Sequence, residues 1–188
     1  MNQDIDKHWS NYYNQGKDFG SITSQALTKL LDFVDQNLPR TCLDIGCGTG
    51  QLTRELHHRG YVCVGIDASA SAARLAKSLT VQDGLNYMLF NIEDEAIKSL
   101  PKQPYSLITC KLVYAFIKDK PNFLSKITNL LAERGTFVII TPLTIDVPPE
   151  KRDIAVDFDQ TMVELRMAFK TVQTYKKHGI TYFICSKQ

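Results

Sequence analysis

Apolar and polar positions alternate along the chain in stretches that predict an ordered series of helices and short buried strands. Residues 22–38 carry apolar side chains at helical spacing and end before Pro39, so a first long helix is expected there. Short apolar runs bounded by glycine or polar residues predict five strands, at 41–45, 61–66, 86–90, 105–110 and 136–141. Helical patterns separate these runs, which indicates β-α-β units and a parallel sheet covered by helices on both faces.

The later part of the chain continues this alternation and then changes it. Ser69 is a suitable N-cap for an alanine-rich helix, and Pro121 fits the first turn of a helix that is expected to end at Glu133. A weaker helical pattern covers residues 154–169. The last two β-rich runs flank a Lys-His-Gly turn and predict an antiparallel hairpin formed by residues 171–176 and 180–185.

Composition favours one globular domain and excludes several other classes. The 188 residues are 44% hydrophobic and 22% charged, which suits a single domain over residues 1–188 and is unlike a disordered chain. The net charge of +2 gives no sign of binding to nucleic acid or to an anionic membrane. No signal-peptide pattern or long apolar run is visible, so we expect a cytoplasmic protein. The five cysteines form no C-x-x-C pair, so we expect reduced, buried thiols.

Three alternating glycines follow the first predicted strand, in the segment Asp44-Ile-Gly-Cys-Gly-Thr-Gly50. Glycine lets a ligand approach the main chain, and the start of the next helix offers unpaired N–H groups and a partial positive charge. A ligand with a carboxylate or a phosphate therefore fits there. The segment differs from the dinucleotide fingerprint, because Gln51 stands where its third glycine belongs, and from a P-loop, which needs G-K-[ST].

Asp67 ends the second predicted strand. A carboxylate at this place can accept two hydrogen bonds from the vicinal hydroxyls of a ribose. The alternative is a structural role, in which Asp67 caps the helix that follows. The glycine segment lies one β-α unit earlier, at the spacing expected for one shared ligand site, and the two features together favour the ribose role.

The glycine segment and the sequence Gly65-Ile-Asp67 together resemble the cofactor site of the class I S-adenosylmethionine-dependent methyltransferases. The resemblance extends from about residue 38 to the C-terminal hairpin. It implies an α/β fold with a Rossmann-like, seven-stranded, mostly parallel sheet of order 3-2-1-4-5-7-6, in which strand 7 is antiparallel and helices lie on both faces. It also implies S-adenosyl-L-methionine as the cofactor.

Individual positions of this chain match the cofactor-binding positions of that family. The resemblance implies contacts from Asp44, Gly46, Cys47, Gly48, Asp67, Ala68, Asn91, Ile92, Glu93, Cys110 and Lys111. Asp44 would orient the glycine loop and the cofactor's amino group, and Asp67 would bind the ribose. At the adenine edge the family often has Asp where this chain has Asn91, and an amide can still pair there because it both donates and accepts. The alternative for Asn91 is a turn residue.

The segment after the fourth predicted strand departs from the family's common pattern. Many small-molecule members carry two histidines where this chain has Ala115 and Phe116, so the usual candidate base is missing. Lys111 and Tyr114 remain as candidate catalytic groups, and the alternatives are a solvated lysine and a packed aromatic ring. The [DN]-P-P-[YF] motif of adenine and amide N-methyltransferases is absent, and the sequence shows no cluster of metal ligands.

Two further segments have predicted roles beside the cofactor. Residues 1–20 resemble the W-x-x-x-Y-x-x-G lid of several family members, which implies that Trp9 and Tyr13 close over the cofactor. The alternative is that these rings cover the core. Residues 142–169 are the stretch available as an insertion for substrate recognition.

These features predict an S-adenosylmethionine-dependent methyltransferase that transfers a methyl group to a small-molecule acceptor by in-line displacement. Without an evident base, a thiol, a neutral amine or an acidic hydroxyl is the easier acceptor to methylate. The alternatives are a protein or RNA methyltransferase and a non-catalytic, S-adenosylmethionine-binding regulatory protein. A dinucleotide reductase is disfavoured by Gln51. We expect a monomer or homodimer, with no nucleic-acid or membrane partner.

Overall fold

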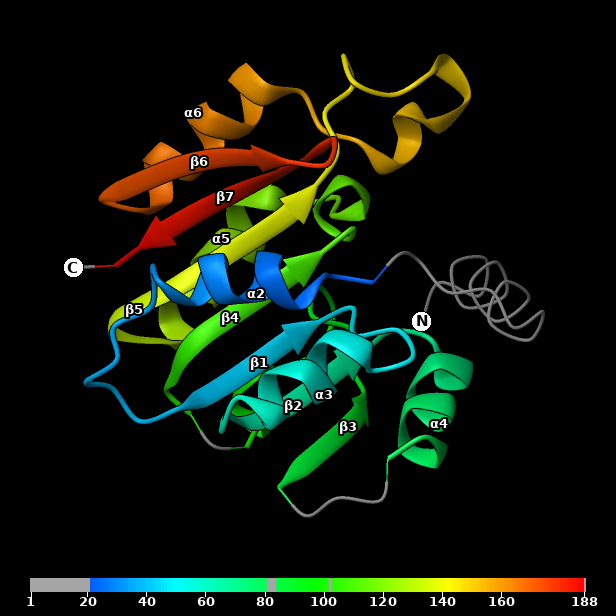
Figure 1. The fold of residues 1–188 in the computed structure, drawn as a ribbon, viewed down its shortest axis with the longest axis vertical. Coiled ribbons are helices and arrows are strands. Elements are labelled where there is room, and N and C mark those ends of the chain that lie inside the picture. The colour runs from blue at the N-terminus through cyan, green and yellow to red at the C-terminus, as the bar shows by residue number, and fades with distance from the viewer. Residues whose placement is uncertain (1–20, 81–83, 102, 188) are drawn as a thin grey trace.

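The strands form one seven-stranded sheet of order β3-β2-β1-β4-β5-β7-β6 in the computed structural model, which describes residues 21–80, 84–101 and 103–187 (Figure 1). The pairs among β1 to β5 are parallel, and β7 runs antiparallel to β5 and to β6. The predicted fold class and strand order are therefore confirmed. The strands are β1 (Thr41–Ile45), β2 (Val62–Asp67), β3 (Leu85–Leu89), β4 (Tyr105–Lys111), β5 (Leu131–Thr141), β6 (Thr171–Lys177) and β7 (Ile180–Ser186).

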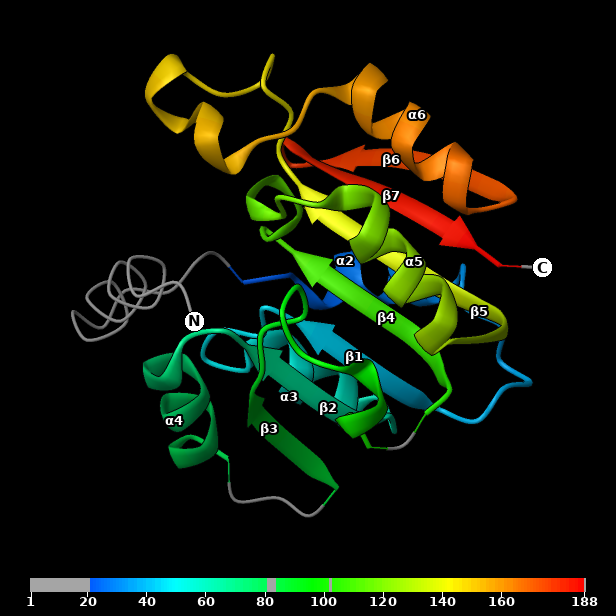
Figure 2. The same cartoon turned by 180° about the vertical axis from the view of Figure 1, so that it is seen from behind.

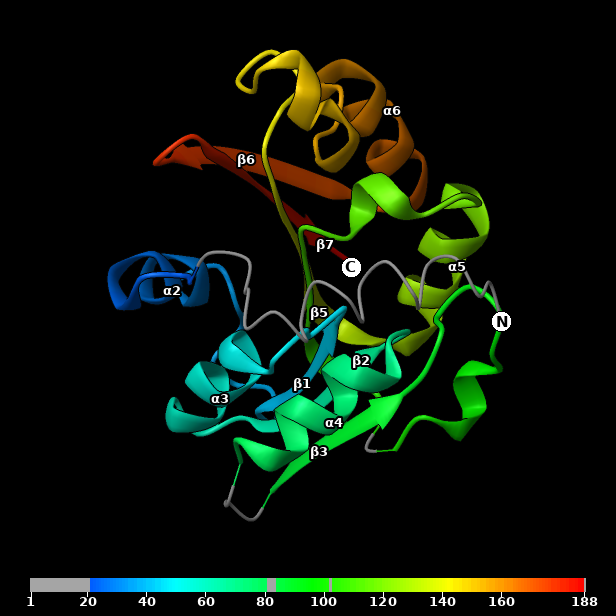
Figure 3. The same cartoon turned by 90° about the vertical axis from the view of Figure 1, so that its right-hand side faces the viewer.

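Helices cover both faces of the sheet, as the view along its edge shows (Figure 3). α2 and α3 lie in front of the sheet in Figure 1, and α5 lies in front of it in the reversed view of Figure 2. The helices are α2 (Ser24–Leu31), α3 (Gln51–His58), α4 (Ala70–Ser78), α5 (Lys120–Leu130) and α6 (Phe158–Ala168), with 3₁₀ turns at Ile97–Ser99, Tyr114–Phe116 and Pro149–Ile154.

Along β1, β2, β5 and β7, neighbouring residues enter the two larger cores that these helices cover. On β1, Leu43 and Ile45 pack in the cluster that contains Leu165 of α6, whereas Cys42 packs in the cluster that contains Leu27 of α2. The five cysteines are buried free thiols, which confirms the prediction from their apolar neighbours. The period of two along the strands thus places one hydrophobic side chain on each face in turn.

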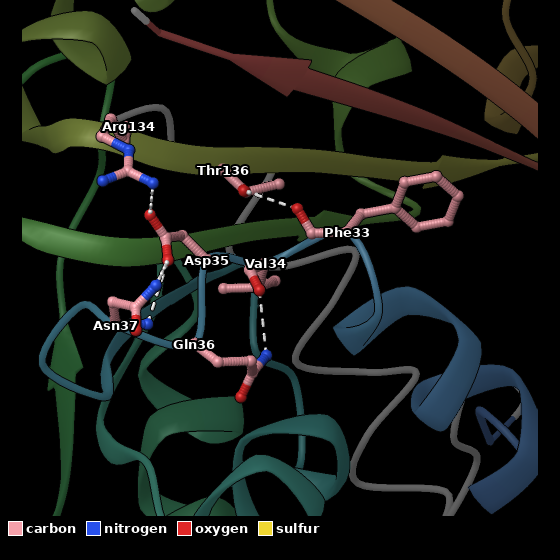
Figure 4. Close-up of polar contacts among 7 residues, drawn as sticks. All are labelled: Phe33, Val34, Asp35, Gln36, Asn37, Arg134 and Thr136. Atoms are coloured by element: carbon pink, nitrogen blue, oxygen red, sulfur yellow. Dashed lines mark hydrogen bonds and ion pairs between the residues drawn. The ribbon is translucent and has the colours of Figure 1, made fainter.

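The first helix is shorter than predicted, because α2 ends well before residue 38. The segment after α2 is held by contacts with a distant part of the chain (Figure 4). Arg134 forms an ion pair of 2.6 Å with Asp35, and the Thr136 hydroxyl donates to the Phe33 carbonyl at 3.3 Å. Both partners belong to β5, so contacts with a distant strand override the local helical pattern.

The helix before β5 also ends earlier than predicted. The expected end was Glu133, but α5 ends at Leu130 and β5 begins at Leu131. Leu131 pairs with Tyr105 of β4, which draws this part of the chain into the sheet. Arg134 then adopts a φ of 62°, in the left-handed region that a helix cannot use. Pairing with β4 therefore replaces the last helical turn.

The weak helical pattern at residues 154–169 is helical only in its later part. Val156 forms a parallel bridge with Leu143, which keeps this stretch extended. Asp157 follows as the N-cap of α6, and its carboxylate accepts the N–H of Gln160 at 2.9 Å. The helix therefore begins where a capping side chain is available.

Two predictions about segments beside the site are not tested by this fold. The proposed lid at residues 1–20, with Trp9 and Tyr13, lies outside the described residues. The role of residues 142–169 in substrate recognition stays a prediction. Within the described ranges, no helix combines the length and the apolar character needed to span a membrane.

Candidate functional site

A cavity opens at the centre of the sheet, where the carboxyl ends of β1 and β4 lie side by side. β1 has β2 on its other side, so the strand order reverses at this point, which is where open parallel sheets bind ligands. The cavity is lined by Asp44, Gly46, Cys47, Thr49, Gln51, Leu52 and Lys111. The predicted cofactor contacts among them are Asp44, Gly46, Cys47 and Lys111.

The glycine loop, residues 46–50, joins β1 to α3 with backbone angles that most residues avoid. Gly46 has a φ of +65° and Gly48 a φ of +55°, in the left-handed region. A Cβ atom on Gly46 would overlap Cγ2 of Val113, which lies in the segment after β4. The main chain of the loop therefore packs directly against the β4 side of the site.

Two side chains hold the end of this loop that leads into α3, and the sequence did not indicate this role for either of them. The Tyr87 hydroxyl of β3 donates to the Gly50 carbonyl at 3.2 Å, and the Arg54 guanidinium donates to the Thr49 carbonyl at 2.7 Å. A Cβ atom on Gly50 would overlap the Tyr87 hydroxyl, so glycine is needed there for the ring to fit beneath the loop.

Asp44 lies at the floor of the cavity and is almost fully buried. Its two carboxylate oxygens accept hydrogen bonds from the hydroxyls of Thr53 and Thr109, each at 2.7 Å. Burial raises the pKa of Asp44, while the two threonine hydroxyls and the nearby ammonium of Lys111 act in the opposite direction. Placing an acid at the centre of the site therefore costs free energy, because the carboxyl group is removed from water.

Replacing Asp44 with asparagine tests this account of the buried acid. Because burial raises the pKa of Asp44, the folded protein binds its proton more tightly than the unfolded chain does. Asp44 therefore contributes stability at low pH that is lost as the pH rises through the raised pKa. We expect the D44N variant to lack this loss and to be at least as stable as the wild type at neutral pH.

Urea unfolding of both proteins over a series of pH values, from the ordinary pKa of an aspartic acid up to neutral pH, measures this difference. The free energy of unfolding of the wild type should fall relative to that of D44N as the pH increases. A D44N protein that is less stable by the same amount at every pH would show that the threonine hydrogen bonds outweigh the cost of burial.

Asp67, at the end of β2, connects the glycine loop to the start of α4. Its Oδ2 accepts the N–H of Gly48 at 2.9 Å, and its Oδ1 accepts the N–H of Ser69 at 2.8 Å. Ser69 is itself the N-cap of α4, as predicted, and Ala68 is half-buried between them. The structural alternative for Asp67 is thus realised in part, because the carboxylate orders both the loop and the helix start.

The segment after β3 is held by internal contacts, in which Asn91 takes its predicted alternative role as a turn residue. The Asn91 side chain accepts the N–H of Glu93 at 3.1 Å and donates to Asp94 at 2.7 Å, as a turn residue does. Ile92 is buried in the core, and the Glu93 carboxylate bonds to the main chain that precedes α5. The predicted adenine contact by the Asn91 amide stays a prediction.

The two candidate catalytic groups lie in different surroundings. Lys111 lines the cavity at the end of β4. Tyr114 is fully buried against Phe123, and its hydroxyl donates to Glu164 of α6 at 2.8 Å. Burial and the adjacent carboxylate raise the pKa of Tyr114, so its hydroxyl keeps the proton that it donates to Glu164 and does not accept one from a substrate. The structure therefore gives Tyr114 the surroundings of a packed aromatic. Cys110 is fully buried, and its predicted contact with the cofactor stays a prediction.

Comparison with known proteins adds to this geometry. The model of a family described as "Methyltransferase domain" matches residues 19–180. The chain belongs to this family. Its membership confirms the resemblance drawn from the glycine segment and Asp67.

Curated relatives and solved structures agree with the membership in the methyltransferase family. Trans-aconitate 2-methyltransferase of Yersinia pestis (strain Pestoides F) is 30% identical over 154 residues, or 79% of this chain and 57% of that protein. Ubiquinone biosynthesis O-methyltransferase of Nitrosomonas europaea is 24% identical over 128 residues, or 68% of this chain and 54% of that protein. The chain spans a little more than half the length of these curated relatives.

The plantazolicin methyltransferase BamL, solved in complex with a triazolic desmethylPZN analog and SAH, has a TM-score of 0.76 to this chain. The sequences are 16% identical, and the alignment covers 97% of this chain and 91% of that chain. At 16% identity, the likeness shows that this chain has the same fold as BamL.

Proposed function

We propose that this protein transfers a methyl group from S-adenosylmethionine to a small-molecule acceptor. The observation that carries the proposal is the placement of two carboxylates, Asp44 and Asp67, on either side of the glycine loop at neighbouring strand ends. Membership in the methyltransferase family supports it, as does the fold shared with a methyltransferase that was solved with SAH.

The residues at the site suit the chemical groups of S-adenosylmethionine. Its α-ammonium suits the carboxyl group of Asp44, and its α-carboxylate suits the ammonium of Lys111. Asp67 accepts the backbone N–H groups of Gly48 and Ser69, and a carboxylate oxygen can accept more than one hydrogen bond, which suits the hydroxyls of a ribose. The base would extend past Ala68 toward residues 91–95. We infer that these residues hold the cofactor in this orientation.

When bound, S-adenosylmethionine supplies a methyl group on a sulfonium, which a nucleophile can displace directly. The protein then has to hold the acceptor in line and to exclude water. Among the described residues that line the cavity, the titratable ones are Asp44, Cys47 and Lys111. Burial raises the pKa of Cys47 well above its ordinary value, and both oxygens of Asp44 accept threonine hydroxyls. This set favours an acceptor that needs no base.

A carboxylate is an acceptor of this kind, because it is already anionic at neutral pH. The relative from Yersinia pestis is named for trans-aconitate, which carries carboxylates. We therefore place a small carboxylic acid first among the acceptors, ahead of a thiol, a neutral amine or an acidic hydroxyl.

Two measurements in sequence test the proposed function. Calorimetry with S-adenosylhomocysteine (SAH), the demethylated product, should show binding of one molecule per chain, whereas NADH should not bind. Transfer of a tritiated methyl group should then be assayed against panels of carboxylic acids, thiols, amines and phenols, with a bulk protein fraction and total RNA as further arms.

Each outcome assigns the protein to one of the classes considered. Turnover on a small acid supports the proposal in full. Labelling of protein or RNA alone would show that the acceptor is a macromolecule and not a small molecule. Binding of SAH without any turnover would favour a regulatory protein. Absence of SAH binding by the folded protein would overturn the cofactor itself.

A further inference from the structure

Lys126 of α5 reaches the loop that follows β3 and bonds to its main chain. Its ammonium donates to the carbonyls of Ile92 at 2.7 Å, Glu93 at 2.6 Å and Glu95 at 3.5 Å. An ammonium has three N–H groups, so this loop can engage all of them. The loop also contains the acidic run Glu93-Asp94-Glu95, whose charge attracts a cation. A lysine from a distant helix therefore fixes the shape of this loop.

Glu93 makes the reciprocal contact, from the loop to the chain that leads into α5. Its Oε1 accepts the N–H of Lys118 at 2.9 Å and the N–H of Asp119 at 3.1 Å. Asp119 is the N-cap of α5, so the contact reaches the first turn of the helix. Two sets of hydrogen bonds thus join the loop to α5. The ammonium of Lys126 donates to carbonyls of the loop, and the carboxylate of Glu93 accepts N–H groups at the start of the helix.

The loop lies one strand beyond Asp67 in the sheet. Asp67 pairs with Leu89 at the end of β3, and the Phe90 N–H donates to the Asp67 carbonyl at 2.9 Å. A ligand with its amino-acid end at β1 and its ribose on Asp67 would carry its base in the direction of β3. The loop at residues 91–95 is the next main chain on that line.

We propose that Lys126 and Glu93 are positioning residues that hold the 91–95 loop in the shape that recognises the adenine ring. This inference rests on the proposed function, since it assumes the cofactor. Lys126 bonds to the main chain of the loop from α5, and the Glu93 carboxylate points toward α5. Their loss should therefore affect recognition of the base more than binding of the methionine end.

The test compares two ligands that differ only at the edge of the base, SAH and S-inosylhomocysteine. The wild type should bind SAH about 10-fold more tightly, as expected for hydrogen bonds to the adenine edge. In the K126M variant, which keeps the length of the side chain without its charge, this preference should fall to about 2-fold. K98M, which removes an exposed lysine of the same region, serves as the matched control and should keep the preference.

The alternatives are separated by the pattern of affinities. Equal weakening of both ligands by K126M, or an unchanged preference, would overturn the positioning role and leave the proposed function intact. A wild type that binds neither ligand would overturn the proposed function instead. If K126M fails to fold, E93Q, which weakens the contact to Lys118 and Asp119, should reduce the preference in the same way. An unchanged preference in folded E93Q would then count against the inference.

Discussion

Replacing Gly48 with valine should weaken SAH binding at least about 100-fold, which corresponds to about 2.7 kcal/mol. Gly48 has a φ of +55°, where a β-branched residue is strained, and its N–H donates to Asp67. Valine would therefore shift the loop and separate it from the carboxylate, in addition to filling the space next to the main chain. Calorimetric titration with SAH measures the loss.

Gly179 provides a matched control for the backbone strain. It has a φ of +77° in the turn between β6 and β7, and a Cβ atom added there would meet nothing within 4 Å. The G179V variant should lower the melting temperature while leaving the affinity for SAH unchanged. If G48V retained wild-type affinity, the glycine loop would not be the place where the ligand approaches the main chain.

Replacing Asp67 with alanine should weaken SAH binding about 10- to 100-fold, because hydrogen bonds to a charged group are worth about 1.5–3 kcal/mol. The effect should be specific to the ribose. The wild type should bind SAH more tightly than its 2′-deoxy derivative, and the D67A variant should bind the two alike. Calorimetry with both ligands measures the two ratios.

Asp67 also orders the loop and the start of α4, so a control for lost capping is required. Asp157 caps α6 through the N–H of Gln160, and D157A should lower stability by about 1 kcal/mol without changing SAH affinity. Circular dichroism checks that D67A is folded. A D67A protein that still prefers SAH over the deoxy ligand would show that Asp67 does not bind the ribose.

Much of the fold follows from local patterns together with the family resemblance. The strand cores were predictable because apolar runs bounded by glycine mark buried strands, and the hairpin at residues 171–185 has its own turn. The glycine loop and Asp67 were predictable because both stand directly after strands. The order of strands, in contrast, came from the resemblance, since periodicity does not say which strands are neighbours.

The features that the sequence did not reveal depend on residues far apart in the chain. Thr109 faces Asp44 because β4 pairs with β1 in a register that places them opposite each other. Arg134 and Asp35 similarly meet only when β5 lies beside the end of α2. Neither contact has a signal in the local sequence. The pattern therefore predicts a first helix that is longer than α2, and it does not indicate the hydroxyl partners of Asp44.

The pairing of β1 with β4 also bears on how the chain folds. Thr41 and Ser106 exchange hydrogen bonds across a separation of 65 residues. Closing a loop of that length costs about 4 kcal/mol of chain entropy, and such contacts slow folding. The floor of the cavity therefore does not exist in a partly folded N-terminal half, where Asp44 would lack Thr109. A ligand that binds across β1 and β4 reports that the two halves of the sheet have joined, and it stabilises that joined state over every earlier one.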